Sequence, residues 1–217
     1  MESDLFLLLI NVYNLSMDKS IFENLADLFI KHGYALYIVG GTSRDYLLGR
    51  KVFDYDFATD ATPDQMAKFL PEADYTFAKF GTISLLYNRQ KVDIVTLRVE
   101  GDYEDFRHPS SIRYVSQISE DYRRRDFTIN ALYIDRQYQI HDFANGLEDL
   151  KNGIIRLIGD PEKRLIEDPL RILRAERFAK KLNFTIEPNT LAAMNKCRHL
   201  LARLNPDKVK EEEKKQK

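Results

Sequence analysis

Apolar and polar positions in the first part of the chain predict short helices and strands in alternation. Residues 19–32 carry apolar side chains at helical spacing, which predicts an amphipathic helix that ends at Gly33. The next run, YALYIVGG, is short, apolar and closed by glycines, as expected of a buried strand that enters a tight turn. Residues 44–48 predict a short helix that ends at Gly49.

More strands follow, separated by one further helix. Thr62 is predicted to take the N-cap position of this helix, Pro63 the first helical position and Gln65 the third, and the helix is predicted to reach Leu70. The strands are predicted over residues 52–59, 75–80, 83–88 and 91–98, and the last two are joined by a turn through residues 88–90.

The later part of the chain is dominated by helical patterns. A helix over residues 126–132 is followed by a predicted hairpin over residues 133–143, and the ending KVKEEEKKQK is predicted to be a solvated, frayed charge run. Further helices are predicted to begin at Asp160-Pro161, to restart at Asp168-Pro169 and to follow Pro188. The change from strands to helices near residue 150 is the only shift that suggests a domain boundary. The predicted fold class is α+β with a small mixed sheet.

Composition narrows the class of protein and its compartment. The 33 basic and 34 acidic residues nearly balance, so contact with nucleic acid must come from local clusters. The single cysteine, Cys197, excludes an internal disulfide framework and favours a reducing compartment, so we expect a cytoplasmic protein. The apolar run at residues 6–10 follows two acids and is too short for a signal peptide, so we interpret it as a helix packing face. No stretch approaches the ~20 apolar residues of a membrane span.

Paired acids supply the candidate chemistry. Asp54 and Asp56 are two residues apart on a predicted strand, so both carboxylates leave the same face and repel each other unless a cation lies between them. Such oxygen ligands suit magnesium, and Asp93 on another predicted strand is a candidate third acid. Three acids around two metal ions are typical of phosphoryl or nucleotidyl transfer. For the D-x-D pattern alone, two solvated acids at a strand end would be the better interpretation.

The residues before these acids favour a metal site over two solvated acids. Gly40 and Gly41 leave a strand and enter a helix that starts near Thr42, so backbone N–H groups and a hydroxyl can face a phosphate. Arg44 adds a fixed fork for phosphate oxygens. Together with the acids, this order of parts indicates a nucleoside-triphosphate site next to a metal site.

Three segments carry a resemblance to a known family. GGTSRDYLLGRKVFDYDFAT at residues 40–59, RRRDFTINALYI at 123–134 and EDPLRILRAERFA at 167–179 resemble, in order, the signature motifs of the class II tRNA nucleotidyltransferase and bacterial poly(A) polymerase family, part of the DNA polymerase beta superfamily. The likeness covers roughly residues 20–200. Ser43 departs from it mildly, because a small apolar residue is more usual there.

The resemblance implies a role for each matching residue. Asp54 and Asp56 would bind the catalytic metals, with Asp93 as third acid. The triphosphate would be bound by Gly40, Gly41, Thr42 and Arg44, the ribose and phosphates of the incoming nucleotide by Arg125, Asp126 and Asn130, and the base by Asp168, Arg171 and Arg174. Independently of the family, Asp126 and Asn130 are four residues apart and would share one face of the predicted helix. Arg123 fits a solvated basic cluster equally well.

The third motif also permits a chemical argument. Asp168 and Arg171, three residues apart, can present an acceptor beside a donor. Cytosine and adenine offer a donor beside an acceptor on their pairing edges, whereas uracil and guanine offer the reverse order and would leave a charged group unpaired, at a cost of about 1–3 kcal/mol. In the family this pair acts as a protein template for CTP and ATP. A helix-capping role for Asp168 and a surface position for Arg171 are the alternative, and both can hold together.

Two further segments have mainly structural interpretations. The pair His141-Asp142 lies in HDFANGLEDL, which the resemblance places at a hinge-like connector between two domains, so we favour a structural role over a metal site. Residues 99–115 resemble the flexible loop that helps the family switch from adding C to adding A. Because relatives that add only C lack that loop, its presence argues that this chain adds A.

The expected protein is a DNA polymerase beta-like nucleotidyltransferase head over residues 1–145, followed by an incomplete helical neck over residues 146–217. We expect template-independent addition of C and A, from CTP and ATP, to the 3′ end of tRNA with two Mg²⁺ ions. The RNA 3′-hydroxyl would attack the α-phosphate and pyrophosphate would leave. An A-adding enzyme or poly(A) polymerase is the alternative within the enzyme class, and a catalytically silent RNA-binding relative is the alternative outside it. The sequence does not indicate an oligomeric state.

Overall fold

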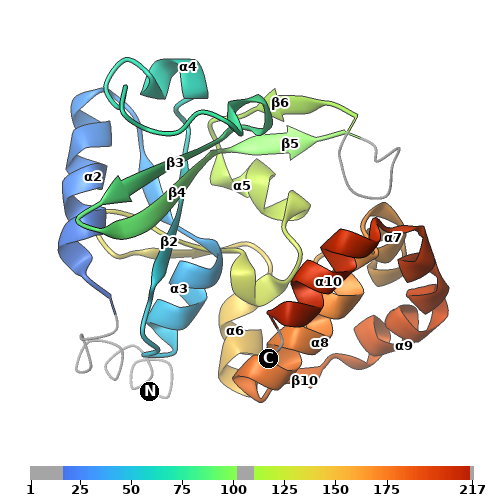
Figure 1. Cartoon of the computed structure of the whole chain (residues 1–217). Coiled ribbons are helices and arrows are strands. Elements are labelled where there is room, and N and C mark those ends of the chain that lie inside the picture. Colours follow the sequence, from blue (N-terminus) through green and yellow to red (C-terminus); the bar gives the residue numbers. More distant parts are fainter. Residues whose placement is uncertain (1–16, 102–109, 216–217) are drawn as a thin grey trace. The chain divides into compact units, whose positions relative to one another are not determined.

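The computed structural model describes residues 17–101 and 110–215. It divides into two compact units that interleave along the chain (Figure 1). The expected helix face at residues 6–10 and the centre of the 99–115 loop lie outside the described residues. The first unit comprises Met1–Arg98, Tyr114–Glu120 and Leu132–His141, and the second comprises Val99–Arg113, Asp121–Ala131 and Asp142–Lys217. The division at residue 145 remains a prediction.

A six-stranded mixed sheet organises the first unit. Its strand order is β3-β4-β2-β1-β7-β8. The pairing of β2 with β4 is parallel, whereas β1 pairs with β2 and with β7, and β3 pairs with β4, in antiparallel fashion. The predicted class, α+β with a small mixed sheet, is therefore confirmed. The strands are β1 (Leu36–Ile38), β2 (Asp54–Thr59), β3 (Thr82–Tyr87), β4 (Gln90–Thr96), β7 (Leu132–Ile134) and β8 (Ile140–Asp142).

Helices of the first unit follow from local signals. The helix α2 (Lys19–Lys31) begins where an Asp18 side-chain oxygen accepts the Ser20 N–H at 3.0 Å, and it buries its apolar face against the sheet, with Phe22 and Phe57 ring centroids 5.4 Å apart. The helix α3 (Gly40–Leu47) starts before the predicted residue 44. The helix α4 (Pro63–Met66) has the predicted capping box but ends before Leu70 and continues as turns.

The second unit is mainly helical. Three of its helices, α7, α9 and α10, carry proline in the first turn and a side-chain cap. The helices predicted from Asp160-Pro161 and after Pro188 are present as α7 and α9. A short parallel ladder joins β9 (Ile154–Ile155) to β10 (Thr185–Ile186). The helices are α6 (Gly146–Asn152), α7 (Pro161–Glu167), α8 (Leu170–Leu182), α9 (Pro188–Cys197) and α10 (Pro206–Lys214), and they lie together in Figure 1.

Shorter elements complete the described chain. The strands β5 (Arg98–Glu100) and β6 (Ile112–Tyr114) form a separate two-stranded ribbon. The remaining elements are α5 (Ile118–Asp121) and the 3₁₀ turns η1 (Ala78–Phe80), η2 (Tyr122–Arg124), η3 (Thr128–Asn130) and η4 (Arg198–Arg203).

Two predicted elements are wrong: a local turn replaces the first, and strand pairing shortens the second. The strand expected at residues 75–80 is a loop ending in η1, because the Asp74 carboxylate accepts hydrogen bonds from the Thr76 N–H and hydroxyl and closes a turn. The helix expected at residues 126–132 is the single turn η3, after which Leu132 already belongs to β7. Strand pairing in the sheet overrides the helical pattern there.

The acidic and basic run at the end of the chain is mostly exposed, as predicted, but residues 206–214 form the helix α10 instead of a frayed end. Within it, Glu212 is buried, 3% exposed, and accepts a hydrogen bond from Arg177 of α8. Composition does not show which position of a charged helix faces the protein, so the burial of Glu212 could not be predicted from it.

Candidate active site

Four charged side chains share one face of the parallel strand pair β2 and β4. The register places Asp54 opposite Lys91 and Asp56 opposite Asp93. Because side chains alternate along a strand, residues two apart on each strand point to the same side. On the other neighbour of β4, Ser84 of β3 lies opposite Asp93. The three acids that the sequence nominated are thus neighbours on one surface.

The glycine turn approaches the second acid closely. The Gly41 N–H donates to Asp56 Oδ2 at 3.2 Å. A Cβ atom at Gly40 or Gly41 would lie 3.2 or 3.3 Å from that oxygen, and Gly40 also has a φ of +68°. Larger residues would therefore crowd the carboxylate, and at Gly40 they would strain the backbone as well. The glycine pair makes room for Asp56 itself.

A threonine fixes the start of α3 to β2. The Thr42 hydroxyl donates to the Asp54 carbonyl at 3.1 Å and accepts the Asp56 N–H at 2.7 Å. The side chain is 1% exposed, so these bonds are shielded from water. The Ser43 hydroxyl donates to the Gly40 carbonyl at 3.2 Å. The acids are held by a rigid strand-to-helix junction.

Arg44 lies in the same junction and is 3% exposed. Its Nε and Nη2 atoms both contact Asp45 Oδ1, at 2.9 and 2.8 Å. The neighbouring carboxylate orients the guanidinium group and compensates its charge. A role of Arg44 in binding triphosphate stays a prediction, and it requires phosphate to compete with Asp45.

Asp93 is held by two neighbours that the sequence reasoning overlooked. Its Oδ1 accepts from the Ser84 hydroxyl at 2.5 Å and its Oδ2 from the Lys91 ammonium at 2.7 Å. The hydrogen bond to Asp93 raises the pKa of Lys91, as do the charges of Asp93, Asp54 and Asp56, against the opposing effect of burial. Among the described residues, no three acidic, histidine or cysteine side chains form a ready group for a metal ion. The role of Asp93 as third acid stays a prediction.

This arrangement nevertheless fits a divalent cation. Asp54 is exposed, Asp56 is half-buried, and both carboxylates leave the face on which the positive charge of Lys91 already lies. Hard carboxylate oxygens with room for water or phosphate are the ligand set that magnesium prefers. The signal that would have found Lys91 was its spacing, two residues before Asp93 on the same strand.

In the second unit, Asp126 lies at the centre of a polar cluster. Its Oδ1 accepts from Asn130 Nδ2 at 3.0 Å and from the Phe127 N–H at 2.7 Å, and its Oδ2 accepts from Arg174 Nε and Nη2 at 2.9 and 2.5 Å. Asp126 and Asn130 were predicted to share one helical face; they are in contact, although the segment forms a 3₁₀ turn and not an α-helix. Arg174, nominated for base recognition, thus binds a residue nominated for ribose recognition.

These contacts change the acidity of Asp126. Burial raises the pKa of its carboxyl group, but the charge of Arg174 and the hydrogen bonds from Asn130, Arg174 and Phe127 outweigh burial and lower the pKa from 3.8 to about 2. The carboxylate is therefore charged throughout the physiological range.

This lowered pKa predicts a loss of stability in acid. A carboxyl group with a lower pKa in the folded state stabilises the fold above pH ~4, and that contribution, about 2 kcal/mol, disappears as the pH falls toward 2. We expect urea unfolding at pH 7, 4 and 2.5 to show that the free energy of unfolding falls more steeply with decreasing pH in the wild type than in Asp126→Asn. The variant is expected to be less stable than the wild type at pH 7. Parallel curves for the two proteins would contradict this assignment.

Two arginines of the second motif, Arg124 and Arg125, are held by an acid, whereas Arg123 is exposed. Arg125 Nη2 lies 3.0 Å from Asp121 Oδ2, and Arg124 Nε donates to Asp121 Oδ1 at 2.8 Å. Asp121 is fully buried. Arg164 of α7 donates to the carbonyls of residues 124 and 125 at 2.8 and 2.9 Å. The second motif is thereby attached to the helices that carry the third.

Asp168 and Arg171 occupy the junction between α7 and α8. Asp168 Oδ1 accepts the Leu170 N–H at 3.0 Å, so the capping alternative holds for it. Arg171 is 4% exposed, and its Nη1 donates to the Arg164 carbonyl at 2.6 Å and contacts Glu167 Oε2 at 3.3 Å. The surface position considered for Arg171 is wrong, because its guanidinium group satisfies a helix-end carbonyl. Their base-recognition role stays a prediction.

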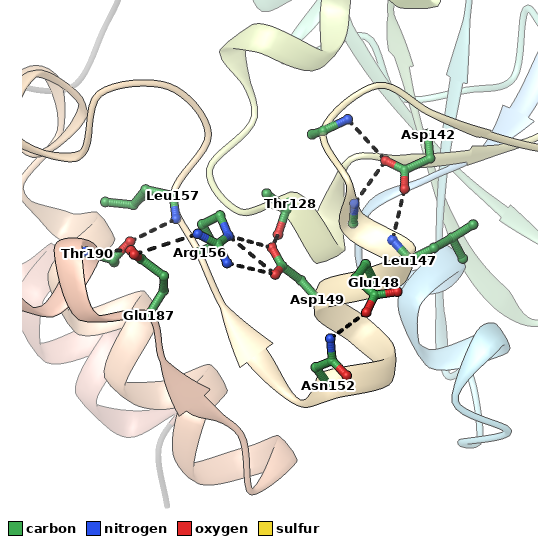
Figure 2. A network of polar contacts seen from close by, with 12 residues as sticks. Thr128, Asp142, Leu147, Glu148, Asp149, Asn152, Arg156, Leu157, Glu187 and Thr190 are labelled. Carbon is green, nitrogen blue, oxygen red and sulfur yellow. Dashed lines mark hydrogen bonds and ion pairs between the residues drawn. The ribbon is translucent and has the colours of Figure 1, made fainter.

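A network of hydrogen bonds and ion pairs, joined to the second motif at Thr128, links α6 to the start of α9 (Figure 2). Asp149 of α6 accepts from the Thr128 hydroxyl at 2.7 Å and from Arg156 Nε at 3.0 Å. The Arg156 guanidinium also lies 3.6 Å from Glu187, whose carboxylate caps α9 by accepting the Thr190 N–H at 2.7 Å. Single charged residues far apart in sequence gave no spacing signal, so sequence reasoning missed this network.

Asp142, also drawn in Figure 2, has a structural role. Its carboxylate accepts backbone N–H groups of Ala144, Gly146 and Leu147 at 2.9–3.0 Å at the start of α6. In the first unit, His141 Nε2 lies 2.8 Å from Asp135 Oδ2. These contacts are those of a capped connector.

Comparison with known proteins assigns the family. The model of the poly A polymerase head domain matches residues 36–156, more than half of the chain. The chain belongs to the poly A polymerase head domain family. The resemblance inferred from the three motifs is thus confirmed, and the match includes the acidic face, the glycine turn and the second motif. Members of this nucleotidyltransferase family generally use divalent metal ions.

Relatives of this family share sequence and fold with the chain. The CCA-adding enzyme of Lactobacillus helveticus is 42% identical over 200 residues, covering 88% of this chain and 50% of the relative. The Bacillus stearothermophilus CCA-adding enzyme in complex with CTP gives a TM-score of 0.82 at 34% identity, covering 89% of this chain and 47% of that one. The Thermotoga maritima CCA-adding enzyme complexed with tRNA(CCA) gives a TM-score of 0.74 at 29% identity, covering 95% of this chain and 49% of that one.

The chain spans about half the length of the curated relatives it matches. Within the residues that the structure describes, every helix is too short or too polar to cross a membrane.

Proposed function

We propose that this chain carries the catalytic part of a nucleotidyltransferase that adds C and A, from CTP and ATP, to the 3′ end of tRNA without a nucleic-acid template. The observation that carries the proposal is the acidic face: Asp54 and Asp56 lie beside Asp93 on parallel strands, next to the turn at Gly40 and Gly41. Relatives named for CCA addition, and solved in complex with CTP or with tRNA, support the choice of substrates.

In the proposed reaction, the RNA 3′-hydroxyl loses its proton to solvent, its oxygen bonds to the α-phosphorus, the bond between that phosphorus and the oxygen that bridges to the β-phosphorus breaks, and pyrophosphate leaves. Asp54 and Asp56 would hold two magnesium ions, with Asp93 as third acid. Bound magnesium supplies activation of the hydroxyl and neutralises charge on the leaving oxygen. The hydrogen bond from Gly41 orients the Asp56 carboxylate before substrate arrives.

Other residues would bind the nucleotide. Gly40, Gly41, Thr42 and Arg44 are proposed to contact the triphosphate, and Arg125, Asp126 and Asn130 the ribose and phosphates. Arg174, proposed for base recognition, would link the base-binding and ribose-binding sets through its contact with Asp126. The low pKa of Asp126 supports this role, because a charged carboxylate accepts hydrogen bonds from hydroxyl groups at any physiological pH.

Asp168 and Arg171 are proposed to select cytosine and adenine. Replacing Asp168 by asparagine keeps an oxygen that can accept the Leu170 N–H but adds an amide donor, which suits uracil. We expect Asp168→Asn to reduce the preference for CTP over UTP about tenfold, within the 1–3 kcal/mol range of a misplaced charged group. Single-turnover rates with each nucleotide measure it. Asp160→Asn is the control, because the Asp160 side chain also accepts a backbone N–H, that of Lys163, at the start of a helix; an equal change there would refute selection by Asp168.

A direct assay tests the proposed function. The chain is incubated with magnesium, one labelled nucleotide at a time, and tRNA that lacks its CCA end. Incorporation of C and then A supports the proposal. Incorporation of A alone identifies an A-adding enzyme or poly(A) polymerase, and no incorporation identifies a silent RNA-binding relative.

The cytoplasm is the proposed compartment. The support is the single cysteine, Cys197, which is buried and unpaired with any other cysteine, as expected in a reducing environment.

A further inference from the structure

The acidic face of β2 and β4 contains its own cation. We propose that Lys91 is a tethered counter-ion of Asp54, Asp56 and Asp93, which an incoming divalent cation must displace, so that Lys91 sets the metal affinity of the site. This inference rests on the proposed function, because it concerns the same acids. Lys91 is a positioning residue in this role and takes no part in bond making.

Strand register places the lysine among the acids. Lys91 lies opposite Asp54 across the parallel pair and two residues before Asp93 on its own strand. All three side chains therefore leave the same face of the sheet. Asp56, opposite Asp93, completes the group. The backbone register sets the face from which the Lys91 side chain leaves, and the side chain then reaches Asp93.

The lysine occupies an oxygen that a metal ion would need. Both carboxylate oxygens of Asp93 are engaged, Oδ1 by the Ser84 hydroxyl at 2.5 Å and Oδ2 by the Lys91 ammonium at 2.7 Å. An ammonium group is a donor without acceptor capacity, so it cannot share that oxygen with a second cation without repulsion. Asp93 can turn Oδ2 toward a metal only after Lys91 moves.

The pair is exposed enough for such an exchange. The side chain of Lys91 is 59% exposed and that of Asp93 28%. An exposed ion pair contributes little stability and is screened by solvent, so a divalent cation with twice the charge can displace the lysine. The raised pKa of Lys91, due first to the Asp93 hydrogen bond and then to the charges of Asp93, Asp54 and Asp56, agrees with its position among all three acids.

Serine and lysine have different parts in this arrangement. Ser84 holds Oδ1 with a neutral hydroxyl group, which can remain in place when a metal arrives. Lys91 brings a positive charge, which cannot remain in place when a metal ion binds. Two states follow for Asp93: one neutralised by the protein's own lysine and one by a metal ion.

Binding of Mn²⁺ to the 217-residue chain tests this proposal without nucleotide, RNA or catalysis. Electron paramagnetic resonance of free Mn²⁺ gives the dissociation constant. We expect Lys91→Met to bind Mn²⁺ about fivefold more tightly than the wild type, as removal of one nearby exposed charge predicts. Lys91→Arg, which retains the charge, should stay close to the wild type. Lys68→Met, at an exposed lysine away from the acidic face, is the control.

A second measurement separates counter-ion from simple repulsion. In EDTA, Lys91→Met should melt at a lower temperature than the wild type, because the three acids lose their counter-ion, and Mn²⁺ should restore more stability to the variant than to the wild type. The variant is expected to fold, since the lysine is exposed.

The outcomes distinguish this inference from the proposed function. If wild type binds Mn²⁺ and Asp56→Asn abolishes that binding, but Lys91→Met binds with unchanged or weaker affinity, the counter-ion role is refuted while the metal site stands. If Mn²⁺ binding is absent, or does not depend on Asp56, the metal site of the proposed function fails and the counter-ion role fails with it.

Discussion

Asp56→Asn is expected to lower the rate of nucleotide transfer by about a thousandfold or more, because removal of a metal-binding charge sacrifices several kcal/mol of transition-state stabilisation. The substitution keeps the size of the side chain and an oxygen that can accept the Gly41 N–H. The fold should therefore survive, and the loss should be confined to catalysis. Single-turnover incorporation of labelled C into tRNA lacking its CCA end measures the rate.

Asp64→Asn is a suitable control for that experiment. Asp64 is an exposed acid in the first turn of α4, so its replacement removes the same charge from the same unit at a distance from the acidic face. Circular dichroism and thermal melting should be alike for the two variants and the wild type. Transfer by Asp56→Asn at more than a tenth of the wild-type rate would remove Asp56 from the proposed metal site.

Glu212→Ala should destabilise the protein by about 3 kcal/mol, the cost of leaving one partner of a buried ion pair without the other. The Glu212 side chain is 3% exposed and that of its partner Arg177 is 12% exposed. The Arg177 guanidinium also lies over the Phe178 ring, 4.2 Å from its centroid, so it cannot turn to water without losing that contact. Urea unfolding followed by circular dichroism gives the free energy of unfolding.

The adjacent residue provides the control for this prediction. Glu213 is exposed in the same helix, and Glu213→Ala changes charge and helix propensity equally but should alter stability by no more than about 0.5 kcal/mol. The double variant Arg177→Met, Glu212→Leu should recover most of the loss, because apolar groups of similar volume can replace a buried ion pair. Equal effects of the two alanine variants would show that α10 does not depend on this pair.

The two nominated sets of residues owe their positions to different kinds of contact. The acids of β2 and β4 are placed by backbone pairing, and Thr42 and Gly41 tie the preceding helix, α3, to them. Asp126 is placed by side chains, above all by Arg174 from α8. Substitutions in the first set should therefore affect chemistry more than folding, whereas substitutions in the second should affect both.

The sequence by itself determined those features that depend on neighbours along the chain. Alternation along one strand put Asp54 and Asp56 on one face, and the Thr62, Pro63 and Gln65 pattern defined a helix start. Three ordered motifs were sufficient to indicate the family, because each combines residue types whose chance coincidence is rare.

Only the tertiary structure decided what depends on distant partners. The parallel register that brings Asp93 and Lys91 beside the first acids, and the buried partner of Glu212, join residues 35 or more positions apart. Local propensity also lost to tertiary contacts at residues 126–132, where strand pairing limits the helix to one turn. Pairings of this kind depend on which surfaces meet when the chain closes on itself, and spacing within a segment carries no information about them.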